Sequence, residues 1–136
     1  MIYGIGTDLC PVERMQEALK RPRFAARVCA PEELARLEAM SPARRAEHLA
    51  GLFAAKEAVS KALGTGFAGF GFADIAILPD GAGRPRVRLS GGAARFSDLN
   101  IHVTITHDAG LALAFAVAET AAQAGRSERG DTDCCH

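Results

Sequence analysis

Four charged or hydroxyl side chains are concentrated in an otherwise apolar stretch, LAGLFAAKEAVSKAL at residues 49–63. They are Lys56, Glu57, Ser60 and Lys61. Glu57 and Lys61 stand four residues apart, so their side chains lie on one face of a helix. A carboxylate suits a hard divalent cation, and a lysine suits a phosphate. The spacing therefore favours a magnesium and phosphate site; the alternative is a surface ion pair worth only about 0.2 to 0.5 kcal/mol.

Asp8 is the candidate for a second metal ligand. Mg²⁺ usually takes one or two protein carboxylates and completes its coordination shell with water and substrate phosphates. Asp8 stands in the sequence GIGTD, at the predicted end of the first strand. Taken alone, an aspartate at such a position is more often a turn or capping residue. Gly4 and Gly6 would allow another backbone or a ligand to approach closely.

The pattern around Glu57 predicts a central helix. Ser41 is the expected N-cap, and Gly64 is the expected stop. At about 100° per residue, the large apolar side chains share one broad face and the small residues lie opposite, so the helix is packed on both sides. Lys56 falls near the middle of the apolar face. It could extend to a pyrophosphate or form a buried structural pair, and both interpretations stay open.

The remaining elements predict an α+β domain that places Asp8 and Glu57 on a strand and a helix. In the N-terminal half we expect a strand at 2–7, a helix of about three turns from Pro11, a short helical piece, a helix opened by Pro31, and then the long helix. After the long helix we expect a hairpin around a turn at 80–83, a short helix in 91–100, and two strands within 101–119 around the turn HDAG. Residues 120–136 are polar and predict a disordered tail.

The composition is that of one folded domain. Of 136 residues 49% are hydrophobic, and 16 basic residues balance 16 acidic ones, which gives no general reason to expect nucleic acid or membrane as a partner. No apolar run reaches the roughly 18 residues of a membrane span, and no signal-peptide pattern opens the chain. These features predict a soluble, cytoplasmic protein. The four cysteines form no metal or disulfide pattern and predict free thiols.

Four segments together resemble the short phosphopantetheinyl transferases, the holo-acyl-carrier-protein synthase family. They are IGTDL near the N-terminus, the pair Glu13 and Arg14, FAAKEAVSKALGTG at 53–66, and HVTITHDAG at 102–110. They occur within residues 1–119, the expected transferase domain. The resemblance implies the phosphopantetheinyl transferase fold, a small antiparallel or mixed sheet wrapped around a long central helix. It also implies a homotrimer whose active sites are shared between neighbouring subunits.

The resemblance further implies a reaction and its residues. The 4'-phosphopantetheine group of coenzyme A would pass to a serine of apo-acyl-carrier protein, releasing adenosine 3',5'-bisphosphate. Mg²⁺ would be held by Asp8, Glu57 and the coenzyme A pyrophosphate, and Lys61 would neutralise phosphate charge. The candidate catalytic residues are Glu57, Lys61, His107 and Asp108. The candidate contacts to coenzyme A are Arg45, Phe53, Lys56, Ser60, Gly64, Pro85, Thr106 and His107.

The chain departs from the family pattern at two positions. Most members lack an aspartate after the histidine, so Asp108 is a candidate general base, with Glu57 acting through a water as the alternative. Leu52 stands where most members carry arginine, and the ion pair of that arginine is absent. Arg44 or Arg45 remains the candidate for the 3'-phosphate of coenzyme A.

The first helical region carries the candidate partner surface. Arg14, Arg21 and Arg27 are basic, whereas Glu13 and Glu17 on the same segment weaken the patch. Taken alone, such a patch is most often a solvated face. Because acyl-carrier proteins in this family are acidic and dock on the first helix, the resemblance makes the patch the expected docking site.

Two other functions use the same residues. A magnesium-dependent nucleotide pyrophosphohydrolase would use the carboxylates with water as the nucleophile and would need no carrier protein. A non-catalytic nucleotide-binding or scaffold protein would use Glu57 and Lys61 only as a structural pair.

Overall fold

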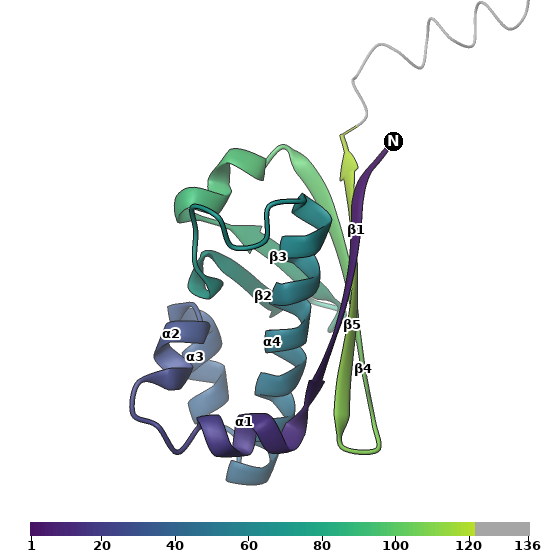
Figure 1. Ribbon diagram of the computed structural model, residues 1–136. Coiled ribbons are helices and arrows are strands. Elements are labelled where there is room, and N and C mark those ends of the chain that lie inside the picture. The colour runs from purple at the N-terminus through teal and green to yellow at the C-terminus, as the bar shows by residue number, and fades with distance from the viewer. Residues whose placement is uncertain (122–136) are drawn as a thin grey trace, which may run out of the picture.

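The computed structural model describes residues 1–121 of the chain. Its elements are arranged around one long helix, with a sheet on one side and short helices on the other (Figure 1). In chain order they are β1 (Ile2–Pro11), α1 (Val12–Ala18), α2 (Phe24–Val28), α3 (Pro31–Glu38), α4 (Pro42–Leu63), the 3-10 helix η1 (Phe72–Asp74), β2 (Ile75–Pro79), β3 (Pro85–Leu89), the 3-10 helix η2 (Gly91–Phe96), β4 (Leu99–Asp108) and β5 (Leu111–Thr120). The predicted α+β class is confirmed.

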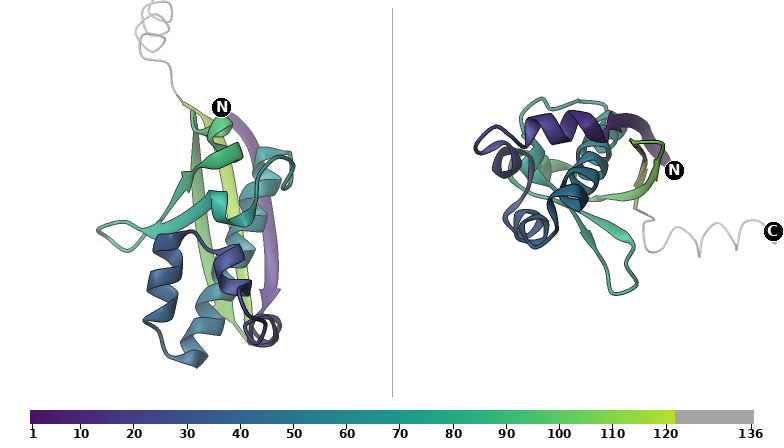
Figure 2. Two further views of the ribbon diagram at one scale, coloured as in Figure 1. Left: turned by 90° about the vertical axis from the view of Figure 1, so that its left-hand side faces the viewer. Right: turned by 90° about the horizontal axis from the view of Figure 1, so that it is seen from below.

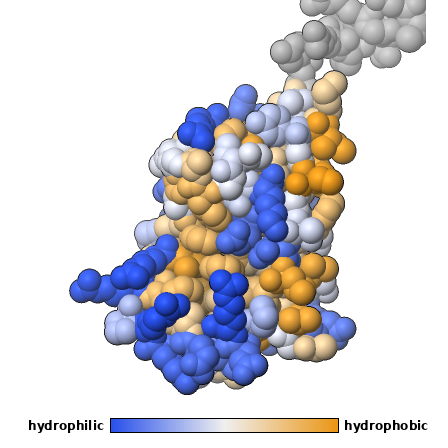
Figure 3. All heavy atoms as spheres, viewed as in Figure 1, coloured by the Kyte–Doolittle hydropathy of each residue, from blue (hydrophilic) through white to orange (hydrophobic). Residues whose placement is uncertain are grey.

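The main sheet has three antiparallel strands in the order β1-β5-β4. On β5, the alanines at 112, 114, 116 and 118 are fully buried, whereas Leu113 and Phe115 between them are exposed. This alternation turns one face of the sheet toward α4. The other face leaves large apolar side chains exposed, and Figure 3 shows apolar residues gathered along the edge of the molecule where β1 lies.

The central helix α4 has the ends that the sequence predicts. The Ser41 hydroxyl accepts a hydrogen bond from the Arg44 backbone N–H at 3.4 Å, and Gly64 ends the helix with a φ of 81°. The helix contacts β1 and β5 on one side and α1, α3 and β2 on others. Because it is enclosed in this way, it needs no broad polar face.

Strand β1 lies directly against α4 because it carries two glycines on the face that meets the helix. A β-carbon at Gly4 would overlap the carbonyl oxygen of Ala62, and one at Gly6 would overlap that of Ala58. The close approach that the sequence allowed is therefore a contact between two backbones. This contact sets how β1, and with it Asp8, sits on the helix.

In the N-terminal half, two boundaries differ from the sequence prediction. Strand β1 continues through Asp8 to Pro11, because Cys10 and Pro11 still pair with Ala112 and Leu111 of β5. Asp8 is thus inside a strand rather than at its end. Helix α1 begins at Val12 and has seven residues instead of about three turns. It ends early because the Lys20 and Arg21 N–H groups bond to carbonyls three residues back, so the chain continues as turns until Arg23, in the left-handed conformation, precedes α2.

The C-terminal half follows the prediction more closely. Strands β2 and β3 form the expected hairpin, which projects from the body in Figure 2. The Asp80 carboxylate accepts hydrogen bonds from the Ala82 and Arg84 backbone N–H groups and so shapes its turn. The short helix predicted in 91–100 is the 3-10 helix η2, which ends at Phe96, and β4 already begins at Leu99. Of the predicted tail, Thr120 is instead the last residue of β5, where it pairs with Leu99, and residues 122–136 lie outside the described part of the chain.

Candidate functional site

Asp8, Glu57 and Lys61 come together where β1 crosses α4. Asp8 follows Gly6 on the strand face that meets the helix, so its carboxylate is only 23% exposed. The Lys61 ammonium donates a hydrogen bond to the Thr7 carbonyl at 2.9 Å and lies 3.5 Å from an Asp8 carboxylate oxygen. Helical spacing places Glu57 one turn before Lys61 on the same face. One strand and one helix therefore supply the whole cluster.

The cluster contains two carboxylates and one ammonium, and this excess of negative charge suits the binding of a cation. Burial raises the pKa of Glu57 above its ordinary value of 4.5, and the Asp8 charge raises it further, whereas Lys61 and Arg14 oppose the rise. Within residues 1–121, no hydrogen bond or ion pair engages the Glu57 carboxylate. No described group of three or more acidic, histidine or cysteine side chains could hold a metal. Two partly exposed carboxylates fit Mg²⁺, which commonly takes no more from a protein.

A separate groove lies along the first helix, and Arg14, which lines it, is close enough to act on the charge of Glu57. The groove has a volume of about 720 Å³ and lies between α1, α2 and Phe53 of α4. The Arg14 guanidinium lies 4.9 Å from the centre of the Phe53 ring, and Arg21 lies 5.1 Å from that of Phe24. Phe53 is 8% exposed and stacks on Phe72 behind it. The groove thus has an aromatic wall and a basic rim.

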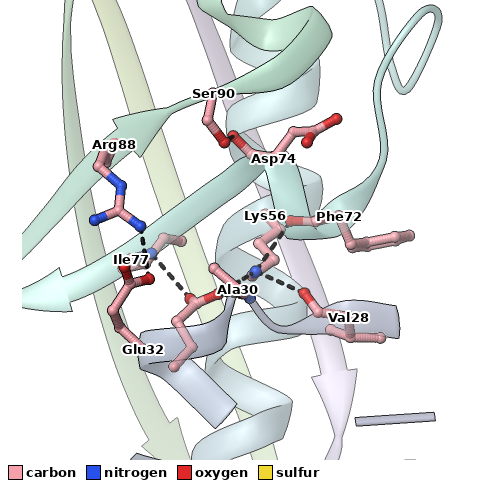
Figure 4. Close-up of polar contacts among 10 residues, drawn as sticks. Val28, Ala30, Glu32, Lys56, Phe72, Asp74, Ile77, Arg88 and Ser90 are labelled. Atoms are coloured by element: carbon pink, nitrogen blue, oxygen red, sulfur yellow. Dashed lines mark hydrogen bonds and ion pairs between the residues drawn. The ribbon is translucent and has the colours of Figure 1, made fainter. Parts of the chain in front are cut away.

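Lys56, predicted to contact coenzyme A, is instead a buried structural residue. Its ammonium donates to the Val28 and Phe72 carbonyls at 2.7 and 3.0 Å, as Figure 4 shows, and to Glu33 at 2.6 Å. Burial lowers the pKa of Lys56, and the charge of Glu33 opposes that shift. An ammonium has three donors, and all three are used. The side chain is fully buried, so the buried pair is correct and the nucleotide contact is wrong.

Ser60 and Gly64 lie on α4 close to the cluster but with different surroundings. The Ser60 hydroxyl donates to the Glu57 carbonyl at 2.7 Å, and the residue is buried. Gly64 leaves open space where a β-carbon would stand. Their predicted contacts to coenzyme A stay predictions.

His107 and Asp108 form a second cluster, separate from the first within this chain. They end β4 with Thr106, and His107 Nε2 lies 3.0 Å from the Glu47 carbonyl oxygen. Glu47 precedes Glu57 by ten residues, which is about 15 Å along a helix. The structure therefore does not bring Asp108 to the carboxylate pair inside one subunit. Arg44 and His48 line a cavity of about 600 Å³ with His107.

Arg45 and Pro85, two predicted coenzyme A contacts, lie in neither cluster. The Arg45 guanidinium donates to the Leu37, Glu38 and Met40 carbonyls and so caps the end of α3. Arg44 is exposed, and of the two arginines it is the one that reaches the His107 cavity. Pro85 begins β3 in the projecting hairpin. Roles for Arg45 and Pro85 in binding the nucleotide remain predictions.

Sequence reasoning missed the buried acid that partners Lys56. Glu33 is 1% exposed, although its position in the first turn of α3 suggests only an interaction with the helix dipole. One signal was available: Glu33 stands four residues before Leu37, on the face of α3 that is buried. A charged residue on an apolar helix face requires a partner.

Comparisons with known proteins agree on one group of enzymes. A family model described as the 4'-phosphopantetheinyl transferase superfamily matches residues 4–116. A holo-(acyl-carrier-protein) synthase of Clostridium novyi is 44% identical over 124 residues, 88% of each chain. A crystal structure of a holo-(acyl-carrier-protein) synthase from Bacillus anthracis in complex with CoA (3',5'-ADP) has a TM-score of 0.79 and 34% identity, covering 89% of this chain and 99% of that one.

A further solved structure carries the same ligand class. The holo-(acyl-carrier-protein) synthase of Helicobacter pylori in complex with coenzyme A has a TM-score of 0.73 and 31% identity, covering 85% of this chain and 99% of that chain. Among the described residues, no helix has both the length and the apolar character needed to cross a membrane.

Proposed function

Because the chain belongs to the 4'-phosphopantetheinyl transferase superfamily, as a holo-(acyl-carrier-protein) synthase, we propose the following reaction. A serine hydroxyl of an acyl-carrier protein attacks the phosphorus that carries pantetheine in coenzyme A. The bond to the bridging oxygen of the pyrophosphate breaks, adenosine 3',5'-bisphosphate leaves, and the serine proton passes to a base. The observation that carries this proposal is the cluster of Asp8, Glu57 and Lys61 where β1 crosses α4.

Asp8 and Glu57 would hold Mg²⁺, and Lys61 would bind phosphate. A divalent cation held there supplies positive charge to the phosphate oxygens as the pyrophosphate bond breaks. Among residues 1–121 nothing engages the Glu57 carboxylate, and Asp8 is held in place by the β1 backbone. The Lys61 side chain is half exposed and reaches over Asp8, so its ammonium can turn from the Thr7 carbonyl toward a bound phosphate. Such charge neutralisation is how proteins assist phosphoryl transfer.

Glu57 acting through a water is our proposed base. Within residues 1–121 its carboxylate accepts no hydrogen bond, so an oxygen is available to take a proton from a water. Asp108 lies near the other end of α4, with Glu47 and Gln16 around it. In this scheme Asp108 can reach the serine only from a neighbouring subunit.

We propose that the protein is a homotrimer with sites shared between subunits. Large apolar residues are exposed on the sheet, namely Ile2, Tyr3, Ile5, Leu9, Leu113 and Phe115. A contiguous apolar surface of this kind marks a contact with another protein. The separation of the two clusters along α4 supports sharing, because a nucleotide site at His107 would then complete the carboxylate pair of a neighbour.

If active sites are shared between subunits, two variants that are each inactive alone should regain activity when they form mixed trimers. Asp8→Asn and His107→Ala chains, each deficient alone, should regain transfer activity when refolded together, because some sites receive both intact residues. Light scattering should give the mass of three chains, and Phe115→Asp should lower it. A mixture no more active than its separate components would contradict shared sites.

An acidic acyl-carrier protein would dock on α1 beside the aromatic groove. Arg14 and Arg21 line the rim of that groove together with Glu17, and Arg27 stands in the last turn of α2. Figure 3 shows hydrophilic residues gathered in the region of α1 to α3. Charge complementarity mainly raises the association rate and fixes orientation.

Reversing the two rim charges should therefore weaken carrier binding. Arg14→Glu with Arg21→Glu should raise the KM for the carrier about tenfold or more, with a weaker effect at high salt. The KM for coenzyme A should change less than the KM for the carrier. Arg36→Glu, an exposed charge reversal on α3, is the matched control. Equal effects of the two changes would contradict docking on α1.

The decisive experiment incubates the protein with coenzyme A, Mg²⁺ and an apo-acyl-carrier protein and weighs the carrier by mass spectrometry. A gain of one phosphopantetheine, absent after chelation of the metal, is expected. Hydrolysis of coenzyme A without a carrier would favour a pyrophosphohydrolase, and binding without turnover would favour a scaffold. An unchanged carrier that a known transferase does modify would refute the proposal.

A further inference from the structure

A buried polar network joins α4 to three other parts of the chain at the residue before Glu57. One Glu33 carboxylate oxygen accepts from the Ala30 backbone N–H at 2.8 Å and from Lys56 at 2.6 Å, and the other accepts from the Ile77 backbone N–H at 2.9 Å. Lys56 adds its bonds to the Val28 and Phe72 carbonyls (Figure 4). The segment leading into α3, the 3-10 helix η1 and strand β2 are thereby tied to one side chain of α4.

The surroundings of α4 give these directional contacts a particular importance. On the side of α4 away from Lys56 the buried residues are small, as at Ala55 and Ala58, so that side is smooth, whereas Leu52, Phe53 and Val59 pack around Lys56 itself. Small apolar contacts oppose rotation of a helix weakly, whereas hydrogen bonds fix direction as well as distance. Gly4 and Gly6 press β1 against another side of the helix. Between them, the network and the glycines determine which way the helix faces at residues 56 and 57.

We propose that Glu33 is a positioning residue: through Lys56 it fixes the rotation of α4 so that Glu57 faces Asp8. Lys56 and Glu57 are neighbours whose side chains point about 100° apart, so a helix turned at Lys56 misdirects Glu57. Displacements of about 1 Å at a reacting centre can cost about a hundredfold in rate. The inference rests on the proposed metal site of Asp8 and Glu57, and it assigns Glu33 and Lys56 no contact with substrate.

The test removes the directional hydrogen bonds, in the double variant without leaving an unpaired buried charge. Glu33→Gln keeps one acceptor oxygen, for either the Ala30 or the Ile77 N–H group, and the double variant Glu33→Gln with Lys56→Met also removes the buried ammonium and its bonds to Val28 and Phe72. An uncharged buried pair is often as stable as an ion pair. The measurement is Mn²⁺ binding by electron paramagnetic resonance with coenzyme A present. The KM for coenzyme A and thermal unfolding are recorded in parallel, with Glu32→Gln, an exposed neighbour, as the control.

Whichever of the two Glu33 variants folds should bind Mn²⁺ about tenfold more weakly than the wild type, because residues that support a metal ligand commonly have an effect of this size. Its KM for coenzyme A should be unchanged. Glu32→Gln should have no effect. Wild-type Mn²⁺ affinity in the folded double variant would overturn the inference, and so would failure of both variants to fold. If the wild type binds no Mn²⁺, or Glu57→Gln binds it equally well, the proposed metal site itself fails.

Discussion

Replacing Glu57 by glutamine is expected to slow phosphopantetheine transfer by roughly a hundred- to a thousandfold. The substitution preserves size and keeps one acceptor oxygen but removes the charge that a hard divalent cation requires. We expect Asp8 and Lys61 to stay paired in this variant, so a lower rate can be assigned to the lost charge of Glu57. Rates measured over a range of Mg²⁺ concentrations should show that excess metal restores little activity.

The same variant should alter the dependence on pH. Since burial and Asp8 raise the pKa of Glu57 in the metal-free protein, protonation of Glu57 should compete with Mg²⁺ binding, so wild-type kcat/KM at limiting Mg²⁺ should fall as pH drops toward that raised pKa. Without metal, a raised pKa favours the protonated folded state. The metal-free wild type should therefore lose stability as pH rises through that pKa, and Mg²⁺ should reverse the loss. Glu57→Gln should show neither effect.

Glu38→Gln, on the exposed end of α3, is the matched control for removing one carboxylate. It should leave both the rate and the pH profile unchanged. An unaltered rate for Glu57→Gln at saturating Mg²⁺ would remove the metal site from the proposed mechanism.

Local patterns predicted the parts of the site that depend on a single helix or a short spacing. Ser41 and Gly64 are strong end signals for α4, and the four-residue spacing of Glu57 and Lys61 places them on one face whatever surrounds the helix. Gly4 and Gly6 indicated close approach without identifying the partner. Asp8 was found because its chemistry complements that of Glu57, although the strand extends three residues beyond it.

Contacts made by distant segments could not be predicted in the same way. Lys56 and Glu33 are 23 residues apart, and their pairing depends on how α3 packs on α4. The capping of α3 by Arg45 likewise depends on the turn between the helices. The distance between His107 and Glu57 follows from register: Asp8 pairs with Ala114 of β5, whereas His107 pairs with Ala112 two residues away and one strand further. Spacing along the chain contains none of this information.

Gly6→Ala is expected to damage both the fold and the site, because the added methyl group meets backbone rather than a flexible side chain. Its β-carbon would overlap the Ala58 carbonyl oxygen and would lie 2.8 Å from the β-carbon of Lys61. Neither atom can move without shifting α4 or β1. Overpacking of this kind costs about 3 kcal/mol of unfolding free energy, so the melting temperature should fall by roughly 10 °C.

The activity of Gly6→Ala should fall further than its stability explains. Asp8 is two residues along the same strand, and a displaced β1 carries it away from Glu57, so Mg²⁺ affinity should drop even well below the melting temperature. Gly81→Ala is the matched control: its β-carbon meets nothing within 4 Å and its backbone needs no positive φ. Because alanine lowers the conformational entropy of the unfolded chain, the free energy of unfolding of Gly81→Ala should be equal to that of the wild type or slightly higher. If Gly6→Ala melts and binds Mg²⁺ as Gly81→Ala does, close contact between β1 and α4 does not position the carboxylates.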